Sequence, residues 1–202
     1  DDVRVDEFYW LNDRENPEVI DYLNKENEYY NAHTAHTKNF QVDLFEEMKS
    51  RIKEDDSSVP YKYNGYWYIT KYEKGKDYPI YTRKKETLDA AEELLFDCNE
   101  MAKNHSYFRL VGLNISPNNE LVSYGIDTTG RRQYGLHIKD LKTNTIFNEE
   151  ISNTTGGSTW ANDNTTLFYA LKDETTLRSE AIYKHKLNTD PKLDTLVFEE
   201  TD

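Results

Sequence analysis

The feature that most restricts the fold of this chain is an internal repeat of aromatic hairpins. Residues 116–141 (SPNNELVSYGIDTTGRRQYGLHIKDL) align with residues 161–187 (ANDNTTLFYALKDETTLRSEAIYKHKL), so that Tyr124 matches Tyr169, and residues 63–85 have the same shape. Each copy contains a turn, a strand with an aromatic residue, a charged loop, a second strand and a polar exit. That order describes the middle hairpin of a four-stranded propeller blade. The repeat predicts a mainly β fold with two to three blades; a chance pair of hairpins is the alternative.

Short β-type runs separated by Asn, Gly and Pro turns extend from Ser57 onward. We expect strands at 66–69, 78–82, 110–115, 121–126, 134–138, 166–169 and 181–185. Residues 87–105 stay ambiguous, because their composition allows a helix while 94–96 suits a strand followed by a short helical turn. Residues 196–202 read as a strand that begins and is then cut. Closed propellers have about four to eight blades, so we expect the polypeptide to continue.

Two helices are expected before the strands. Asn16 can cap the first, Pro17 suits its first turn, and Glu18 suits its positive end. One face of this helix would carry Ile20, Leu23, Asn27 and Tyr30. The second helix is predicted to end near Asp55, and its apolar stripe repeats every four residues at Phe40, Leu44, Met48 and Ile52. Both stripes need a surface to cover, and we expect that surface outside this chain.

Charge and cysteine content restrict the function classes. Lys and Arg number 25 against 38 Asp and Glu, a formal net charge of −13. This charge repels phosphate backbones and argues against nucleic-acid binding; it serves solubility or attracts basic peptides. The single cysteine, Cys98, cannot form an internal disulfide and is expected to be a small packed residue in a reducing compartment. No apolar run reaches the roughly 18 residues of a membrane-spanning helix.

One serine has some features of a nucleophile. Ser158 lies in GGSTW, which approaches the G-x-S-x-G elbow of α/β-hydrolases. The final glycine is replaced by Trp160, and the following residues read as a strand rather than a helix. We therefore interpret residues 156–160 as a Gly-rich turn between blades, and Ser158 is not expected to be catalytic.

The remaining polar clusters also favour structural roles. His33 and His36 stand three residues apart, a spacing that can clamp a metal, but no third ligand is evident. Residues 54–56 (EDD) are consecutive and do not face one another; we expect a helix end in which Ser57 or Ser58 bonds the local backbone. The pair at 131–132 (RR) is expected in a solvated turn, and Trp67 and Trp160 in the core. We assign no catalytic residue, no cofactor and no metal site.

Several sequence motifs along the chain resemble those of oligopeptidase B, within the prolyl oligopeptidase group of serine peptidases. The most specific stretch is 48–84, which contains EDDSSVPY (54–61) and GYWY (65–68), and NPEV (16–19) and DTTGRRQY (127–134) add support. Ile69 departs from the pattern, since the family often has another aromatic residue there. The resemblance covers nearly the whole chain.

This resemblance implies a domain plan and an activity. Residues 1–56 would be an N-terminal helical arm that packs on a C-terminal α/β-hydrolase domain. Residues 57–202 would be the first blades of a seven-bladed propeller that covers the active site and admits short peptides. The parent enzyme would be a cytoplasmic serine oligopeptidase that cleaves basic peptides after Arg or Lys. In that family the catalytic Ser, Asp and His come from the C-terminal domain, so this chain alone is expected to be inactive.

Other readings remain open at this point. A non-catalytic propeller could use the acidic surface to bind a basic protein; an elbow serine followed by Asp and His elsewhere in the parent gene would decide for the enzyme. A propeller glycosidase is a weaker third reading, because it needs carboxylates around a central pocket. Pro60, near the crossing into the first blade, is a hypothetical hinge. Unfinished blade edges and the stripe starting at Phe40 predict that the isolated chain self-associates.

Overall fold

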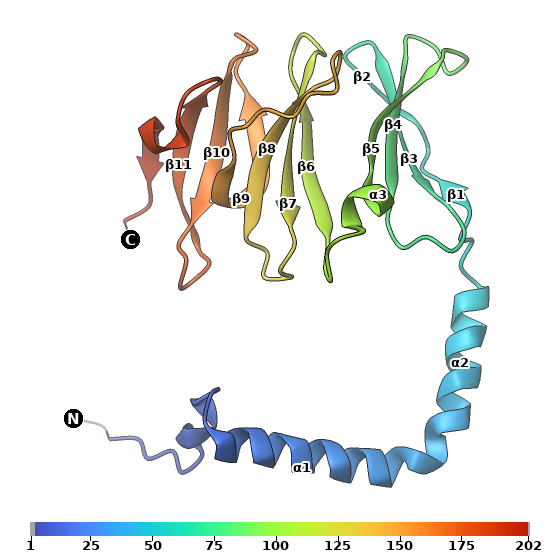
Figure 1. Ribbon diagram of the computed structural model, residues 1–202, viewed down its shortest axis with the longest axis vertical. Coiled ribbons are helices and arrows are strands. Elements are labelled where there is room, and N and C mark those ends of the chain that lie inside the picture. The colour runs from blue at the N-terminus through green and yellow to red at the C-terminus, as the bar shows by residue number, and fades with distance from the viewer. Residues whose placement is uncertain (1–2, 202) are drawn as a thin grey trace. The chain divides into compact units, whose positions relative to one another are not determined.

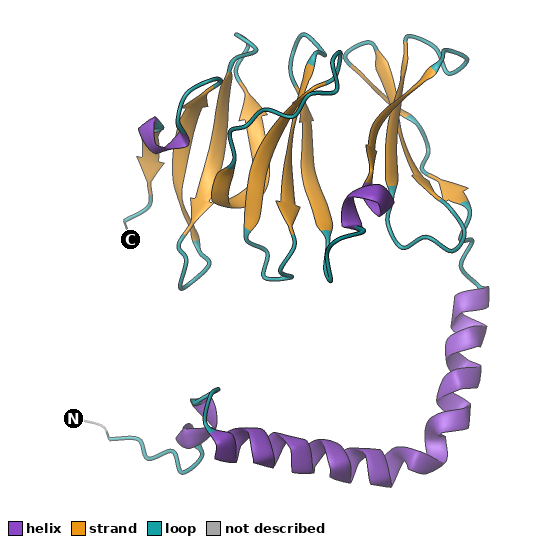
Figure 2. Cartoon of the chain, in the orientation of Figure 1, coloured by secondary structure: helices purple, strands orange, loops and turns teal. Residues whose placement is uncertain are grey.

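The computed structural model describes residues 3–201, which form two compact units (Figures 1 and 2). The boundary lies between Lys53 and Glu54. The first unit is helical and the second is built from antiparallel strands with two short helices. None of the helices within residues 3–201 combines the length and the apolar composition of a membrane-spanning segment.

The first α-helix of the helical unit begins at the residue that the sequence predicts. The unit contains η1 (Tyr9–Asn12), α1 (Pro17–Thr34), η2 (Ala35–Thr37) and α2 (Lys38–Ser50). The side chain of Asn16 caps α1 by accepting a hydrogen bond from the Glu18 backbone N–H at 2.9 Å. Pro17 occupies the first turn, where its missing N–H leaves no bond unmade.

The apolar faces of the two helices are largely uncovered within the described chain. Burial in the described α1 is confined to Val19, and α2 has no buried residue. Ile20 and Leu23, both predicted to face a partner, are about half exposed. The predicted end of the second helix near Asp55 is wrong: α2 stops at Ser50, because the chain turns into an extended segment that pairs with a strand.

The first blade, as we call the strands from 56 to 97, is a five-stranded antiparallel sheet. β3 (Tyr66–Tyr72), β4 (Ile80–Lys85) and β5 (Glu92–Asp97) follow in order, and β1 (Asp56–Ser57) and β2 (Tyr61–Tyr63) both pair with β3. The ambiguous stretch is a strand followed by a short helix, α3 (Cys98–Ala102). Asp97 ends β5 and caps α3 by accepting from the Asn99 and Glu100 N–H groups.

A seven-stranded antiparallel sheet in sequence order contains the next two blades (Figure 1). We call β6 (Arg109–Ile115), β7 (Leu121–Asp127), β8 (Tyr134–Asp140) and the bridged stretch 145–147 the second blade. The third blade is β9 (Ile151–Trp160), β10 (Thr166–Lys172), β11 (Ser179–Lys186) and β12 (Thr195–Glu199), with η3 (Pro191–Leu193) before β12. The repeat prediction is confirmed, since Tyr124 and Tyr169 are buried on the second strand of their blades.

The Gly-rich segment at 156–160 is a strand rather than the predicted turn. It forms the second half of β9, which pairs with β8 through Ile151 and Thr154 and with β10 up to Trp160. Thr154 faces Leu171 and Ser158 faces Tyr169, so residues 155–157 oppose a single β10 residue. With this bulge, β9 of the third blade also pairs at its start with β8 of the second blade, and no turn separates the two pairings.

Buried side chains join the blades. One cluster, which includes Tyr68, Phe96, Cys98 and Tyr124, combines first-blade and second-blade residues. The Phe96 and Tyr124 rings lie 4.5 Å apart between centroids. Two smaller clusters join the second and third blades, one around Trp160 and Leu167 and one around Leu136 and Tyr169. Burying each large apolar side chain contributes roughly 1.5–3 kcal/mol, so these contacts hold the blades together.

Candidate functional site between the second and third blades

The environment of Ser158 does not resemble that of a nucleophile. Its hydroxyl is hydrogen-bonded to the hydroxyl of Ser123 at 2.7 Å, on the neighbouring blade. Its carbonyl accepts from the Asn114 amide, and the Asn114 carbonyl accepts from the Trp160 indole N–H at 2.9 Å. A nucleophilic serine needs an adjacent base, whereas the bond formed here is to another alcohol. Ser158 therefore ties β9 to the second blade.

The two histidines of the helical unit are occupied by local backbone bonds. The Nδ1 atoms of His33 and His36 lie 3.0 Å from the carbonyl oxygens of Tyr29 and His33, respectively. Both rings are exposed. Within residues 3–201, no group of three or more His, Cys, Asp and Glu side chains is arranged to hold a metal ion.

The acidic and basic runs have structural positions. Asp56 begins β1. Of the two serines expected to bond the local backbone, Ser58 instead accepts at its Oγ from the Thr70 N–H at 3.0 Å, a partner on the neighbouring strand. The pair at 131–132 lies in the exposed turn between β7 and β8. Trp67 is half-buried and donates its indole N–H to the Glu86 carbonyl at 3.0 Å.

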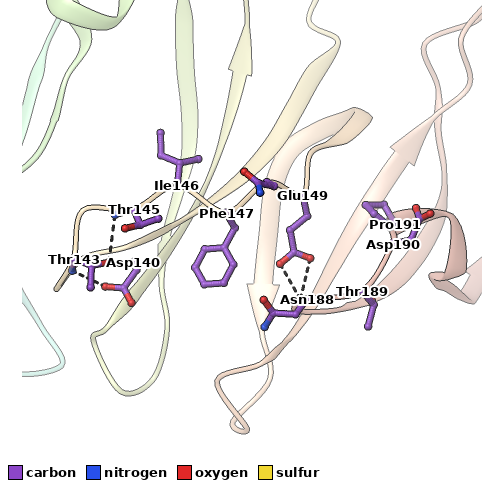
Figure 3. Close-up of a pocket in the computed structure, with 11 residues that line it drawn as sticks. Asp140, Thr143, Thr145, Ile146, Phe147, Glu149, Asn188, Thr189, Asp190 and Pro191 are labelled. Carbon is purple, nitrogen blue, oxygen red and sulfur yellow. Dashed lines mark hydrogen bonds between the residues drawn. The ribbon is translucent and has the colours of Figure 1, made fainter.

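A cleft of about 710 Å³ opens where the second blade ends and the loop after β11 passes (Figure 3). The second-blade side contributes Asp140, Ile146 and Phe147, and the loop side contributes Asn188 and Asp190. In Figure 3 the Phe147 ring lies between these two sides. The cleft therefore combines an apolar centre with acidic walls.

The carboxylates of the cleft bind backbone N–H groups. Asp140 accepts from Lys142 and Thr143 at 2.8 Å each, and the Thr143 bond is the main reason that the Asp140 pKa lies below its usual value. Glu149 accepts from the Asn188 N–H with both oxygens, at 2.8 and 3.0 Å. These bonds fix the two loops of the cleft, and those to Asp140 favour the ionised form of its carboxylate.

Behind Glu149 lies a buried polar group that we call the His185 cluster, formed by Glu149, Tyr169, His185 and Asp194. His185 Nε2 lies 3.0 Å from Glu149 Oε2, and its Nδ1 lies 2.7 Å from Asp194 Oδ1. The Tyr169 hydroxyl donates to Asp194 Oδ2 at 2.8 Å. The exposed fraction is 0% for the His185 side chain, 8% for Glu149 and 3% for Asp194. Burial, followed by the bond to Asp194, raises the pKa of Tyr169 well above its ordinary value.

Sequence reasoning missed this cluster. It treated His185 as the end of a strand and assigned nothing to Glu149 or Asp194, which lie outside regular strands. One signal was available: Ala181, Tyr183 and His185 share one face of an alternating strand. A histidine on an inward face requires buried hydrogen-bond partners, but the sequence does not say which loops supply them.

Comparison with protein families gives a match along the whole chain. Residues 1–202 match the family model described as the N-terminal β-propeller domain of prolyl oligopeptidase. Dipeptidyl aminopeptidase BI of Pseudoxanthomonas mexicana is 38% identical over 98% of this chain, and Protease 2 of Moraxella lacunata is 32% identical over 100% of it. The chain spans 30% of the length of each of these relatives.

Solved structures give the same fold. Oligopeptidase B from Leishmania major superposes with a TM-score of 0.88 at 35% identity, over 98% of this chain and 29% of that one. Oligopeptidase B from Trypanosoma brucei, in a closed form with covalently bound antipain, gives a TM-score of 0.86 at 26% identity, over 98% and 28%.

Proposed function

The chain belongs to the prolyl oligopeptidase family, in which it matches the N-terminal β-propeller domain, and we propose that it serves as the arm and gate of a peptidase. The observation that carries this proposal is the family match over residues 1–202. The TM-score of 0.88 to an oligopeptidase B supports it. In this proposal the unit that starts at Glu54 forms propeller blades that restrict the substrate to short peptides, and the helical unit that ends at Lys53 forms the arm.

The parent enzyme is proposed to be a serine peptidase that cleaves after Arg or Lys. The 35% identity to an oligopeptidase B supports this specificity, as does the net charge of −13, which attracts cationic peptides. One relative is named a dipeptidyl aminopeptidase and the other a protease. We propose internal cleavage for the parent of this chain, and the substrates below distinguish it from removal of dipeptides at a free N-terminus.

The proposed role of the helical unit is to dock on an α/β-hydrolase domain that supplies the catalytic Ser, Asp and His. Its uncovered apolar side chains support this role. Phe40, Phe45 and Met48 on α2 are 65%, 58% and 54% exposed. Such a run of apolar side chains on one helix is stable when a second surface covers it.

The chain by itself is proposed to have no peptidase activity. The contacts of Ser158 support this, because its hydroxyl joins two strands and has another hydroxyl as its partner. We also propose a cytoplasmic location. The buried free thiol of Cys98, the one cysteine of the sequence, is compatible with a reducing compartment.

Two chromogenic peptides test the proposal. Each ends in Arg before the reporter group, and one has a blocked N-terminus while the other is a dipeptide with a free one. We expect the full protein to cleave the blocked peptide and the 202-residue chain to cleave neither. Cleavage of the free dipeptide alone would replace the proposed specificity by dipeptidyl aminopeptidase activity. No cleavage of either, in a protein without an elbow serine, would favour a binding propeller.

A further inference from the structure

The His185 cluster joins three segments that are distant in the sequence. Glu149 lies just before β9, His185 is on β11, and Asp194 lies between η3 and β12. Each ring nitrogen of His185 faces a carboxylate oxygen, at 2.7 Å for Asp194 and 3.0 Å for Glu149. The third blade is therefore tied to its own outermost segment and to the linker before β9 through one imidazole.

Counting hydrogen-bond donors determines how many protons this arrangement needs. A neutral imidazole has one N–H, and an ionised carboxylate has none. Two carboxylates facing two ring nitrogens therefore leave one contact without a hydrogen unless the cluster holds an additional proton. With 0% of the His185 side chain exposed, water cannot supply the missing donor.

The surrounding donors decide where that proton resides. Tyr169 donates to Asp194, and the Asn188 N–H donates to Glu149. Each carboxylate therefore already accepts a hydrogen bond from a donor other than the imidazole, and imidazole is a more basic group than a carboxylate. The additional proton therefore belongs on His185, which becomes an imidazolium that donates to both sides.

We propose that the His185 cluster is a proton-dependent latch: a buried imidazolium holds the 188–195 segment against the linker before β9, and removal of its proton releases that segment. Loss of the proton leaves a ring nitrogen lone pair facing a carboxylate, which repels it in a site without water. The released part would be the loop with η3, which forms one side of the cleft.

The other charged groups near the cluster do not replace this proton. On β10, the residue paired with His185 is the apolar Leu167. Lys184 and Lys186 flank His185 on β11, and Lys186 bonds to Asp163 at 3.2 Å and to Thr165. Asp190, in the loop, accepts from the Lys192 N–H. Within the described residues, the groups that bond to the His185 ring are Glu149 and Asp194, with Tyr169 behind Asp194.

The sign of the pH effect follows from proton linkage. The latched state holds one proton more than the released state above neutral pH, so the latched state loses population as pH rises. One proton corresponds to about a tenfold change in the opening equilibrium for each pH unit. This pH dependence is opposite in direction to that of a turn stabilised by an ionised carboxylate, which becomes less stable as pH falls.

Asp194→Asn provides the discriminating variant. The amide N–H₂ of asparagine can donate to Nδ1 while its oxygen accepts from Tyr169, and a neutral ring can donate from Nε2 to Glu149. All contacts are then satisfied without the additional proton. Glu149→Gln removes the need for the proton in the same way from the other side. Asp190→Asn, in the same loop but outside the cluster, is the matched control.

The test is hydrogen exchange in the full protein from about pH 6 to about pH 9, corrected for the intrinsic rate. We expect protection of residues 188–199 to fall about tenfold per pH unit at the alkaline end in the wild type and in Asp190→Asn. Protection in Asp194→Asn and Glu149→Gln should stay level. Nitrogen NMR of labelled histidine should find both ring nitrogens of His185 protonated at neutral pH.

Protection that does not change with pH in the wild type would overturn the latch. The same decrease of protection with pH in Asp194→Asn as in the wild type would also overturn it. One protonated ring nitrogen at neutral pH would also overturn it. If Asp194→Asn does not fold, Glu149→Gln decides by the same criterion; failure of both to fold, with Asp190→Asn folded, would contradict the donor count, which predicts that Asp194→Asn retains all contacts and that Glu149→Gln loses only the longer of its two Asn188 bonds.

Discussion

The carbonyl oxygen of Gly156 in β9 lies 2.1 Å from the position that a β-carbon on Gly112 in β6 would occupy. The two backbones touch at this point, where β9 crosses between blades. Gly125 in β7 stands against the same place, with the Gly156 Cα 2.4 Å from its own missing β-carbon. Three glycines from three strands thus allow a backbone contact that no other residue type fits.

Substituting these glycines should destabilise the β-strand unit. Gly125→Ala meets only the clash, while Gly112→Ala also requires a left-handed backbone at φ 65°. We expect each to cost about 2 kcal/mol or more in the free energy of unfolding, with Gly112→Ala the worse. Urea unfolding measures this free energy. Gly157→Ala is the control, because the β-carbon it would add has no neighbouring atom within 4 Å beyond the adjacent residues. Equal losses of stability in Gly157→Ala and Gly125→Ala would contradict the close contact.

The carboxylate of Asp127 organises the turn between β7 and β8. It is 1% exposed and accepts from the N–H groups of Thr129, Gly130 and Arg132 and from the Thr129 hydroxyl, at 2.7–3.0 Å. Burial acts to raise its pKa, but these bonds outweigh burial and the pKa lies below the ordinary value. Its contribution to stability is therefore complete above the unfolded-state pKa and is lost as pH falls through the folded-state value.

Asp127→Asn should lower the free energy of unfolding by about 1–3 kcal/mol at neutral pH, since the charged acceptor is lost in a buried site. The difference from wild type should shrink in acid, where the wild-type carboxylate is protonated. Thermal unfolding across pH measures both effects. Asp173→Asn lies in an exposed turn where the carboxylate accepts from two N–H groups and the Thr176 hydroxyl, one N–H fewer than at Asp127, and should cost less; an equal cost would contradict the role given to burial and to the additional bond.

Asparagines join the hairpin tips of successive blades. The Asn64 side chain donates to the Pro117 carbonyl at 2.7 Å, and Asn164 Oδ1 accepts from the Asn118 N–H at 2.8 Å. Asn164 has φ 59°, so Asn164→Gly removes its side chain without adding backbone strain. We expect a loss of about 0.5–1.5 kcal/mol.

Asn144→Gly is the matched control for the hairpin tips. Asn144 also has a positive φ, of 61°, but lies outside these tips. Chemical unfolding of the two variants should therefore separate the hydrogen bond from the effect of glycine on the backbone. A loss at Asn144 equal to that at Asn164 would remove the case for a bond between blades.

Cys98 should be chemically inert in the folded protein. It is 1% exposed, and burial, assisted by the charge of Asp97, raises its pKa to about 12. Because the thiolate is the reactive form, a disulfide reagent at pH 8 should label the thiol slowly, at a rate that follows unfolding. Denaturant should restore fast labelling. Fast labelling without denaturant would mean that the cluster around Cys98 opens readily.

The isolated chain should self-associate through its uncovered apolar surfaces. Light scattering at increasing concentration should give a dimer or larger species. Replacing Phe40 and Met48, 65% and 54% exposed, by Glu should reduce it. Replacing the exposed polar residues Gln41 and Lys49 on the same helix is the matched control. A monomer at every concentration would contradict the expectation and weaken the proposed docking role of α2.

The helix signals and the repeat were readable because they depend on local chemistry. Asn16 and Pro17 predict a helix start at the observed residue, since capping involves neighbours in the sequence. Alternating aromatic strands predicted the hairpins of each blade for the same reason. The end of α2 was misjudged because Asp56 pairs with Tyr72, a partner far along the chain.

What the sequence determined by itself was the start of α1 at Asn16 and Pro17, the repeated aromatic hairpins and the family. The tertiary structure decided that the Gly156 segment is a strand that crosses between blades, and that His185 lies between Glu149 and Asp194. Both outcomes depend on groups brought together from separate parts of the chain. A glycine has no side chain that would indicate which backbone it contacts, and a buried histidine needs hydrogen-bond partners that its own sequence position does not identify. The packing of the blades determines both the backbone contact of Gly156 and the partners of His185.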